Sequence, residues 1–434
     1  MEQVSSLKTG VKYKDTPIGK IPVDWEVLKL NNIGELKGGN GFSEKYQGHR
    51  DLKYLFIKVS DMNLPCNDIY IRNSINTIDD ELKEILKCNI FPRDTIVFAK
   101  VGAALLLNRR RIITKKSAID NNMMGLIVKK GYYPKFYYYI LQTIDFAKYV
   151  FSGALPSVNQ KIIGDIDVVS PPLNEQKGIA EILTTVDEGI EKTAQVIEKI
   201  KELKKGLMQR LFTQGIGHKR FKKTEIGEIP AEWEVVPLSK TLIGHKSRYG
   251  VYKERRLYGE GTQILKIGDV FQKDFYSGEK TQRLMLSEKE LISNEVFPND
   301  ILMAVASVKL EGVGEAMYVL RLNEKTAFDH NLANIRTDHN KCNPKFLFYT
   351  LKSRIIRKRI ESLCTKVGTT FLKASEIDKF LIPVPPLNEQ HQIAEILFEL
   401  DAQIEKESNH KEQLETLKKG LMQVLLTGKL RVAV

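Results

Sequence analysis

The sequence predicts an α+β protein of two pseudo-repeated mixed α/β domains, each followed by a long helix, with the two helices pairing as an antiparallel coiled coil. Three observations carry this prediction. The hexapeptide Pro-Pro-Leu-Asn-Glu-Gln occurs at 171–176 and again at 385–390. The pattern Ile-Pro-x-x-Trp-Glu-Val occurs at 21–27 and 229–235 and holds both tryptophans of the chain. After each hexapeptide, apolar residues recur at alternating steps of three and four, the heptad pattern of a coiled coil.

The two long helical runs correspond residue by residue. Ile-Ala-Glu-Ile-Leu stands at 179–183 and 393–397, and Lys-Lys-Gly-Leu-Met-Gln at 204–209 and 418–423, always at the hexapeptide offset of 385 − 171 = 214. No insertion therefore interrupts either helix, and the 38 residues from 174 to 211 predict a rod of roughly 57 Å at about 1.5 Å per residue. The predicted spacer residues are Ile179, Leu183, Val186, Ile190, Ile197, Ile200, Leu207, Leu211, Ile393, Leu397, Leu400, Ile404, Leu414, Leu421 and Leu425.

An amphipathic helix lying on its own globular core is the alternative for either run taken alone. Two equal helices, each introduced by Pro-Pro, favour pairing with each other. The second seam has a polar middle, with Glu407 and Lys411 where the first copy is mostly apolar. This polar stretch is open to two interpretations, looser pairing or a face for a partner protein.

Composition and charge limit the class of protein. Hydrophobic residues make up 42% and charged residues 28% of the chain, and no run approaches the roughly 18 apolar residues of a membrane helix. The amino terminus lacks an export signal, so we expect a cytoplasmic protein with no membrane contact. Four widely spaced cysteines predict partly buried thiols rather than a metal site. The net charge of +13 indicates a polyanionic partner.

The remaining elements follow in matched pairs. Each tryptophan segment predicts a turn and a short strand, with Trp25 and Trp233 as packing anchors. Segments 56–61 and 264–269 predict strands with one solvent-exposed face. Segments 91–99 and 297–305 predict a turn that contains proline, followed by a buried strand. Pro134 and Pro344 each suit the first turn of a helix that carries, in the first copy, a tyrosine cluster expected in the core. The predicted parts are a leader 1–15, domains 16–172 and 216–386, helices 173–215 and 387–428, and a tail 429–434.

Two loops in each domain diverge between the copies, although their flanks match. They are 37–50 with its counterpart 244–256, and 100–111 with its counterpart 306–314, and they are rich in glycine, basic and hydrogen-bonding residues. Neither glycine-rich loop has the Walker spacing of a nucleotide-binding site. Divergence inside a shared frame indicates that the two domains do different work at these loops.

No catalytic constellation stands out. The chain has no Asn/Asp-Pro-Pro-Tyr/Phe motif for amino methylation, no Gly-x-Ser-x-Gly, no His-Glu-x-x-His and no convincing Asp…Glu-x-Lys nuclease core. Its seven histidines are scattered. Catalysis is therefore expected to come from elsewhere.

Together, the paired tryptophan entries, the loops after Asp94 and Asp300, the glycine segments at 153 and 368, the hexapeptides and the Lys-Lys-Gly-Leu-Met-Gln helix ends resemble the DNA-specificity subunits of Type I restriction-modification systems. The resemblance covers residues 16–428. It implies two target-recognition domains, each reading half of a split DNA sequence, with the helices setting the unread gap. It also implies two adenine methyltransferase subunits that bind S-adenosylmethionine, and restriction subunits that use ATP and Mg²⁺. No cofactor is expected on this chain.

Basic residues are expected to hold phosphates while polar loop residues read base edges in double-stranded DNA. A solvated surface charge is the alternative for each of them. Two other functions compete, a cryptic metal-dependent nuclease and an assembly scaffold without sequence preference. The candidate DNA contacts are Lys37, Asn40, Lys45, Gln47, Arg50, Lys100, Asn108, Arg109, Arg110 and Arg111 in the first domain, and Lys246, Arg248, Tyr249, Lys253, Arg255, Arg256 and Lys309 in the second.

Overall fold

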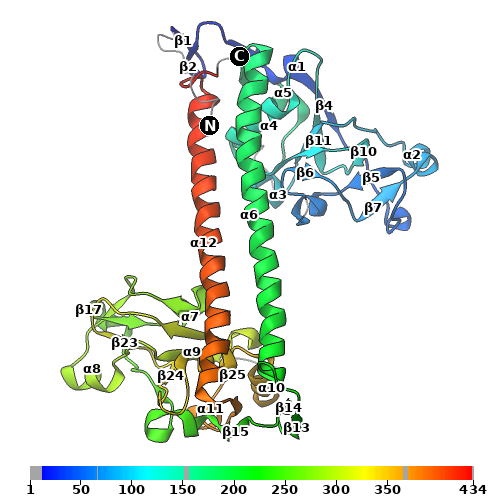
Figure 1. The fold of residues 1–434 in the computed structure, drawn as a ribbon. Coiled ribbons are helices and arrows are strands. Elements are labelled where there is room, and N and C mark those ends of the chain that lie inside the picture. The colour runs from blue at the N-terminus through cyan, green and yellow to red at the C-terminus, as the bar shows by residue number, and fades with distance from the viewer. Residues whose placement is uncertain (1–11, 66, 151–155, 365–369, 433–434) are drawn as a thin grey trace. The chain divides into compact units, whose positions relative to one another are not determined.

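The computed structural model describes residues 12–65, 67–150, 156–364 and 370–432. It divides into two compact units, unit 1 from Met1–Thr193 with His410–Val434 and unit 2 from Ala194–Asn409. Each unit holds one globular domain and a part of each of two long helices, α6 (Leu173–Gln214) and α12 (Leu387–Leu425) (Figure 1). The predicted fold class, two mixed α/β domains each followed by a long helix, is confirmed.

The domain of unit 1 is built around one five-stranded sheet. Its order is β4-β11-β8-β9-β6, with β6 parallel to β9 and the other neighbours antiparallel. A three-stranded sheet, β10-β5-β7, and the pairs β1-β2 and β12-β3 complete it. The strands are β1 (Tyr13–Thr16), β2 (Gly19–Pro22), β3 (Glu26–Lys29), β4 (Gly34–Gly38), β5 (Tyr54–Ile57), β6 (Tyr70–Ile71), β7 (Asn76–Ile78), β8 (Ile96–Ala99), β9 (Arg110–Ile113), β10 (Ser117–Ile119), β11 (Met123–Val128) and β12 (Asp167–Ser170). The helices are α1 (Leu30–Ile33), α2 (Asp80–Leu86), α3 (Ala103–Leu106), α4 (Pro134–Thr143) and α5 (Gln160–Gly164), with 3-10 turns η1 (Glu44–Tyr46), η2 (Val59–Asn63) and η3 (Phe146–Tyr149).

The domain of unit 2 repeats this topology. Its five-stranded sheet has the order β16-β24-β20-β22-β18, and its three-stranded sheet the order β19-β17-β23. The strands are β13 (Phe221–Thr224), β14 (Gly227–Pro230), β15 (Glu234–Pro237), β16 (Arg248–Tyr249), β17 (Tyr258–Leu265), β18 (Phe275–Tyr276), β19 (Arg283–Leu284), β20 (Ile301–Ala304), β21 (Ala306–Ser307), β22 (Ala316–Val319), β23 (Thr326–Phe328), β24 (Leu332–Ile335), β25 (Thr370–Phe371) and β26 (Leu381–Val384). The helices are α7 (Ile267–Gln272), α8 (Glu288–Asn294), α9 (Pro344–Leu351), α10 (Arg354–Leu363) and α11 (Ala374–Ile377), with 3-10 turns η4 (Leu238–Thr241), η5 (Ile243–His245), η6 (Arg255–Leu257) and η7 (Leu310–Gly312).

The hexapeptide ties the start of each long helix to its domain. Trp25 is fully buried and its indole N–H donates to Glu175 Oε2 at 2.9 Å, while the amide of Gln176 accepts from the Tyr133 backbone N–H and donates to the Pro171 carbonyl. In unit 2 the hexapeptide makes the corresponding contacts, with Trp233 donating to Glu389 at 2.9 Å. The two tryptophans are therefore core anchors, as predicted, because a buried indole N–H needs an acceptor.

The two long helices run antiparallel within each unit. In unit 1 the core includes Ile179 and Leu183 of α6 together with Leu425 of α12, and in unit 2 it includes Leu211 with Ile393 and Leu397 of α12. In unit 1, Asp187 pairs with Lys418, whereas Gly178, nearer the start of α6, approaches Val432 beyond the end of α12. Helix pairing and packing on a globular core, which the sequence offered as alternatives, both occur along one helix.

Two expectations about the sheets are wrong. Segments 56–61 and 264–269 were expected to be strands with one solvent-exposed face, but β5 and β17 end at Ile57 and Leu265, and a helical turn follows each. At these ends both faces of each strand are buried, because alternate residues pack into separate hydrophobic clusters: Leu55 and Ile57 opposite Phe56, and Leu265 opposite Ile264. Lys58, which suggested the solvent-exposed face, lies beyond the strand end, where its backbone N–H donates to Asp61 at 2.7 Å.

The repeat alignment around the proline turns is shifted by one residue. Asp94 and Asn299 both have positive φ and both donate a backbone N–H to the strand beside them, to Ile113 and Val319 respectively. The true counterpart of Asp94 is therefore Asn299 rather than Asp300. The buried strands β8 and β20 that follow are as predicted.

The other predicted elements are present. The proline-led helices begin at Pro134 and Pro344, and the tyrosines at 137–139 lie in the core with at most 3% of their surface exposed. Three cysteines, Cys88, Cys342 and Cys364, are buried and free, while Cys66 and the glycines at 153 and 368 lie outside the described residues. Within the described ranges, no helix combines the length and apolarity that a membrane crossing requires.

Candidate nucleic-acid interface

A tightly packed glycine anchors the first divergent loop of each domain. A Cβ atom on Gly39 would lie 2.2 Å from the carbonyl oxygens of Ile119 and Asp120, and one on Gly250 would lie 2.1 Å from the carbonyl oxygen of Phe328. Such distances leave room only for glycine at these two points. The divergent loops therefore leave the core at equivalent, tightly held positions.

The first loop of unit 1 contains both fixed and free candidates. The side chain of Asn40 donates to the Lys87 carbonyl and accepts from the Asn89 N–H, so its polar atoms serve the loop itself. Gln47 is likewise engaged with Phe42 and Lys58, and Lys37 pairs with Glu35 at 2.9 Å. The two remaining candidates, Lys45 and Arg50, are exposed.

The second loop of unit 1 corrects the prediction for the arginine run. Arg110 is 2% exposed, its guanidinium lies 3.8 Å from the Phe146 ring centroid, and it donates to Asn108 and to the Ile144 carbonyl. Burial lowers the pKa of Arg110 to about 10. Arg111 is half-buried and donates to the carbonyls of Met62 and Asn67.

These contacts change the set of candidates. A buried guanidinium cannot reach a phosphate, so Arg110 is withdrawn as a DNA contact, and Asn108 and Arg111 serve to position the loop. Arg109 remains fully available at the surface, and Lys100 is half-exposed at the end of β8.

The first loop of unit 2 presents a mixed basic and aromatic surface. The Tyr249 hydroxyl donates to the Leu372 carbonyl at 3.3 Å and accepts from the Ala374 N–H, and its ring lies 5.9 Å from Phe371. Lys253 is paired with Glu290 at 2.5 Å, and Arg256 with Glu254 at 2.8 Å. Lys246 and Arg255 are exposed, and Arg248 is half-buried on β16.

The second loop of unit 2 is held by a residue that the sequence did not single out. Arg357 of α10 donates to the carbonyls of Leu310 and Val313, at 2.8 and 2.7 Å, and to that of Glu311 at 3.3 Å. These contacts of Arg357, here called the clamp, hold η7 in place. The tip of the loop, Val308 and Lys309, comes just before η7; Val308 is 84% exposed and Lys309 is exposed beside it. An apolar side chain this exposed next to a lysine is a further candidate for a DNA contact, since valine can contact a thymine methyl group.

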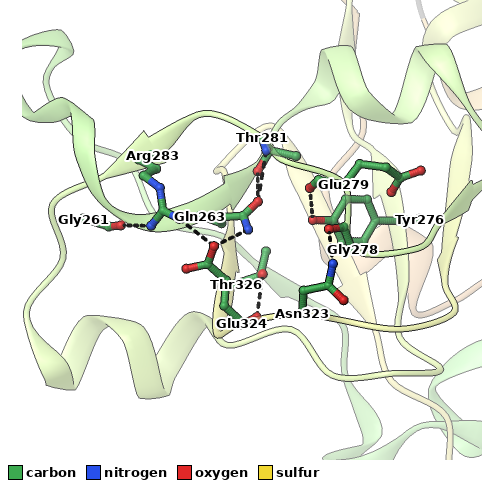
Figure 2. A network of polar contacts seen from close by, with 10 residues as sticks. All are labelled: Gly261, Gln263, Tyr276, Gly278, Glu279, Thr281, Arg283, Asn323, Glu324 and Thr326. Atoms are coloured by element: carbon green, nitrogen blue, oxygen red, sulfur yellow. Dashed lines mark hydrogen bonds and ion pairs between the residues drawn. The ribbon is translucent and has the colours of Figure 1, made fainter.

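Other charged side chains of unit 2 are paired within the domain. Figure 2 shows Gln263 of β17 accepting from Thr281 and donating to Glu324, and the same carboxylate pairs with Arg283 at 2.6 Å. Nearby, Asn323 donates to the Gly278 carbonyl at 2.8 Å. This network stabilises the edge of the three-stranded sheet, so Arg283 is not counted among the candidates.

A duplicated α/β domain with divergent basic loops, joined through paired helices, defines a class of nucleic-acid recognition protein. The family model described as Type I restriction modification DNA specificity domain matches residues 22–202 and 230–416. The chain belongs to this family and carries two copies of its domain. It is a specificity subunit of a type I restriction-modification system, and its role is DNA sequence recognition rather than catalysis.

Relatives agree with this assignment. The type I restriction enzyme MjaVIII specificity subunit of Methanocaldococcus jannaschii is 34% identical over 282 residues, which cover 64% of this chain and 65% of the relative. The MjaX specificity subunit of the same organism is 30% identical over 439 residues, covering 97% of both chains. Among solved structures, the type I S subunit of M. genitalium shares the fold with a TM-score of 0.59 at 14% identity, over 97% of both chains.

Proposed function

We propose that this chain reads a bipartite DNA target, with one half-site for each domain. The proposed target-recognition domains are residues 16–172 and 216–386, and residues 173–215 and 387–428 form the connecting helices, with a leader at 1–15 and a tail at 429–434. The proposal includes a non-catalytic role beside two adenine methyltransferase subunits and ATP-dependent restriction subunits in the cytoplasm. S-adenosylmethionine, ATP and Mg²⁺ would bind to those partners.

One observation carries the bipartite part of this proposal. The two domains keep one topology and one set of anchors, yet the loops that leave those anchors differ in sequence and in exposed charge. A shared frame with different exposed loops suits two domains that bind the same polymer and read different bases. The candidates that the structure leaves free for contacts are Lys45, Arg50, Lys100 and Arg109 in unit 1, and Lys246, Arg255, Val308 and Lys309 in unit 2.

The long helices support a fixed distance between half-sites. Helix α6 has 42 residues and α12 has 39, so they span about 63 and 58 Å at about 1.5 Å per residue. A continuous helix of this length is stiffer than a flexible linker, and a stiff connection selects one gap. All fifteen predicted spacer residues are buried or half-buried, in agreement with this role.

Exposed apolar residues on the helices support two copies of one partner. Unit 1 exposes Leu173, Ile182 and Leu417, and unit 2 exposes their repeat counterparts Leu387, Ile396 and Leu203. The exposed fractions are 37, 37 and 50% in unit 1, and 38, 37 and 53% in unit 2. Equal apolar sets suit two identical methyltransferase subunits, because each unit then offers the same contacts.

Modification mapping tests the proposal directly. The chain is co-expressed with its methyltransferase subunit, and modified adenines are mapped across the host genome. The expected result is one bipartite motif with a fixed gap. Modification without a motif would favour the scaffold without sequence preference, and DNA cutting by the chain alone with a divalent metal would favour the nuclease.

The partner surface has its own test. The variant Ile182→Glu should weaken one of the two methyltransferase sites. Native mass spectrometry should then show a complex with one methyltransferase subunit per chain (1:1) beside the complex with two (2:1). Glutamate at Ile396 should have the same effect. Both variants retaining a full 2:1 complex would refute this docking surface.

A further inference from the structure

An ion pair of low exposure lies between the two long helices in unit 2. Lys204 Nζ of α6 is 2.5 Å from Asp401 Oδ1 of α12, and the two side chains are 14 and 11% exposed. The hydroxyl of Tyr349, on α9 of the globular domain, donates to the other carboxylate oxygen of Asp401 at 2.6 Å. The lysine ammonium also lies 5.4 Å from the centroid of the Tyr349 ring. Three elements therefore meet at one carboxylate.

Unit 1 contains the same arrangement with the helices exchanged. Lys418 Nζ of α12 is 2.7 Å from Asp187 Oδ1 of α6, with side chains 19 and 4% exposed. Tyr139 of α4 donates to Asp187 Oδ2 at 2.7 Å, and Lys418 lies 5.6 Å from its ring centroid. The aspartates and the lysines occupy repeat-equivalent positions, since 401 − 187 and 418 − 204 both equal 214.

The apolar contacts around these ion pairs do not by themselves fix the axial register of the two helices, so the charged residues decide it. Apolar heptad positions tolerate a shift of one helix along the other, because one leucine replaces another in the same hole. The middle of α12 adds little discrimination, since its seam positions there are Glu407 and Lys411, both charged, where α6 has Thr193 and Ile197. A shift would separate aspartates and lysines of low exposure from their partners, which is strongly unfavourable.

We propose that the two triads, Lys204–Asp401–Tyr349 and Lys418–Asp187–Tyr139, are positioning residues that fix the axial register of α6 against α12. The tyrosines also fix each domain against the helix pair. The inference rests on the proposed function, because register matters for recognition only if the helices set the gap. A slip of one helical turn moves a helix by about 5.4 Å, which corresponds to between one and two base pairs at about 3.4 Å each.

The test replaces both ion pairs with apolar residues and maps the gap. The variant Lys204→Met, Asp401→Leu, Lys418→Met, Asp187→Leu keeps the seam packed and removes the charges, a type of exchange that proteins often tolerate. Co-expressed with the methyltransferase subunit, it should modify the original half-sites at gaps one or two base pairs longer or shorter. The fraction of such sites should rise by about tenfold or more, a change worth about 1.4 kcal/mol.

A matched control uses an exposed pair on the same helix. Lys201 and Glu198 are 2.9 Å apart but 54 and 69% exposed, and replacing both with glutamine should leave the gap unchanged. The charge-swapped variant Lys204→Asp, Asp401→Lys should keep a single gap, because the pair is rebuilt. Relaxed spacing in that variant as well would overturn the proposal.

The other outcomes of this experiment also bear on the proposal. A single unchanged gap in the assembled apolar variant would show that the triads do not select the register. If the apolar variant fails to fold, the milder Asp187→Asn, Asp401→Asn variant carries the same two outcomes. Absence of a bipartite motif in the unmodified protein would instead refute the proposed function, so the two failures are distinguishable.

Discussion

Replacing Arg431 with alanine should destabilise unit 1 and leave unit 2 intact. This residue follows the end of α12, and its guanidinium donates to both carboxylate oxygens of Glu175, at 2.6 and 2.8 Å. It also donates to Asp24 at 2.9 and 2.6 Å. Glu175 is the hexapeptide carboxylate that accepts from Trp25, so Arg431 supports the contact that attaches α6 to its domain.

The size of the effect follows from burial. The side chains of Arg431 and Glu175 are 12 and 4% exposed, and removing one partner of a buried ion pair costs about 3–5 kcal/mol. Asp24 is 48% exposed, so its pair adds at most about 1 kcal/mol. Glu175 keeps the Trp25 N–H, which places the expected loss near the lower limit, about 3 kcal/mol. For a unit of this size that corresponds to a fall in Tm of roughly 6–12 °C.

Hydrogen exchange followed by mass spectrometry measures the two units separately, and calorimetry gives the Tm. Amides of the unit 1 core should exchange faster in Arg431→Ala, while those of the unit 2 core keep their protection. The control is Lys429→Ala, two residues earlier on the same tail and exposed. Identical behaviour of the two variants, or equal loss of protection in both units, would refute the assigned role.

Three further predictions concern the recognition loops. Gly250→Ala should displace the first loop of unit 2 and abolish modification at one half-site, whereas Gly268→Ala, with open space around it, should not; modification mapping distinguishes them. Arg357→Met should free the β21–η7 loop and weaken the same half-site at least tenfold in a binding assay, with the fold unchanged by circular dichroism. The carboxylate of Glu290 pairs with Lys253 and also accepts from the backbone N–H and hydroxyl of Ser287, the N-cap residue of α8. These contacts lower the pKa of Glu290 to about 2, so the stability that this carboxylate provides is present above its ordinary pKa and is lost as the pH falls toward 2. In Lys253→Met, an NMR titration should show the pKa of Glu290 rising toward its ordinary value, and an unchanged pKa would contradict the pairing.

Much of the fold could be predicted because the chain contains two copies of one repeat, and the copies can be compared with each other. A constant offset of 214 between matched positions showed that no insertion interrupts either helix, and heptad spacing showed which faces are apolar. The tryptophan anchors were predictable for a related reason, since a large aromatic residue repeated in one context belongs to a core. Their acceptors, Glu175 and Glu389, were not predicted, although both stand in the repeated hexapeptide.

The recognition loops were predictable only as segments. A run of three arginines looks equally basic at each position, but β9 directs Arg110 inward against Phe146 and leaves Arg109 in solvent. The exposed tip at Val308 and its clamp, Arg357, could not be found, because the tip and the clamp lie far apart in the chain and neither belongs to a motif.

The sequence by itself determined the duplication, the class of fold, the two long helices and the loops at which the domains differ. These follow from local periodicity and from comparing one half of the chain with the other. Only the tertiary structure decided which charges are exposed, and that Lys204 pairs with Asp401 and Lys418 with Asp187. Periodicity tells which face of a helix is buried, but the partner on that face is chosen by three-dimensional packing between segments far apart in the chain.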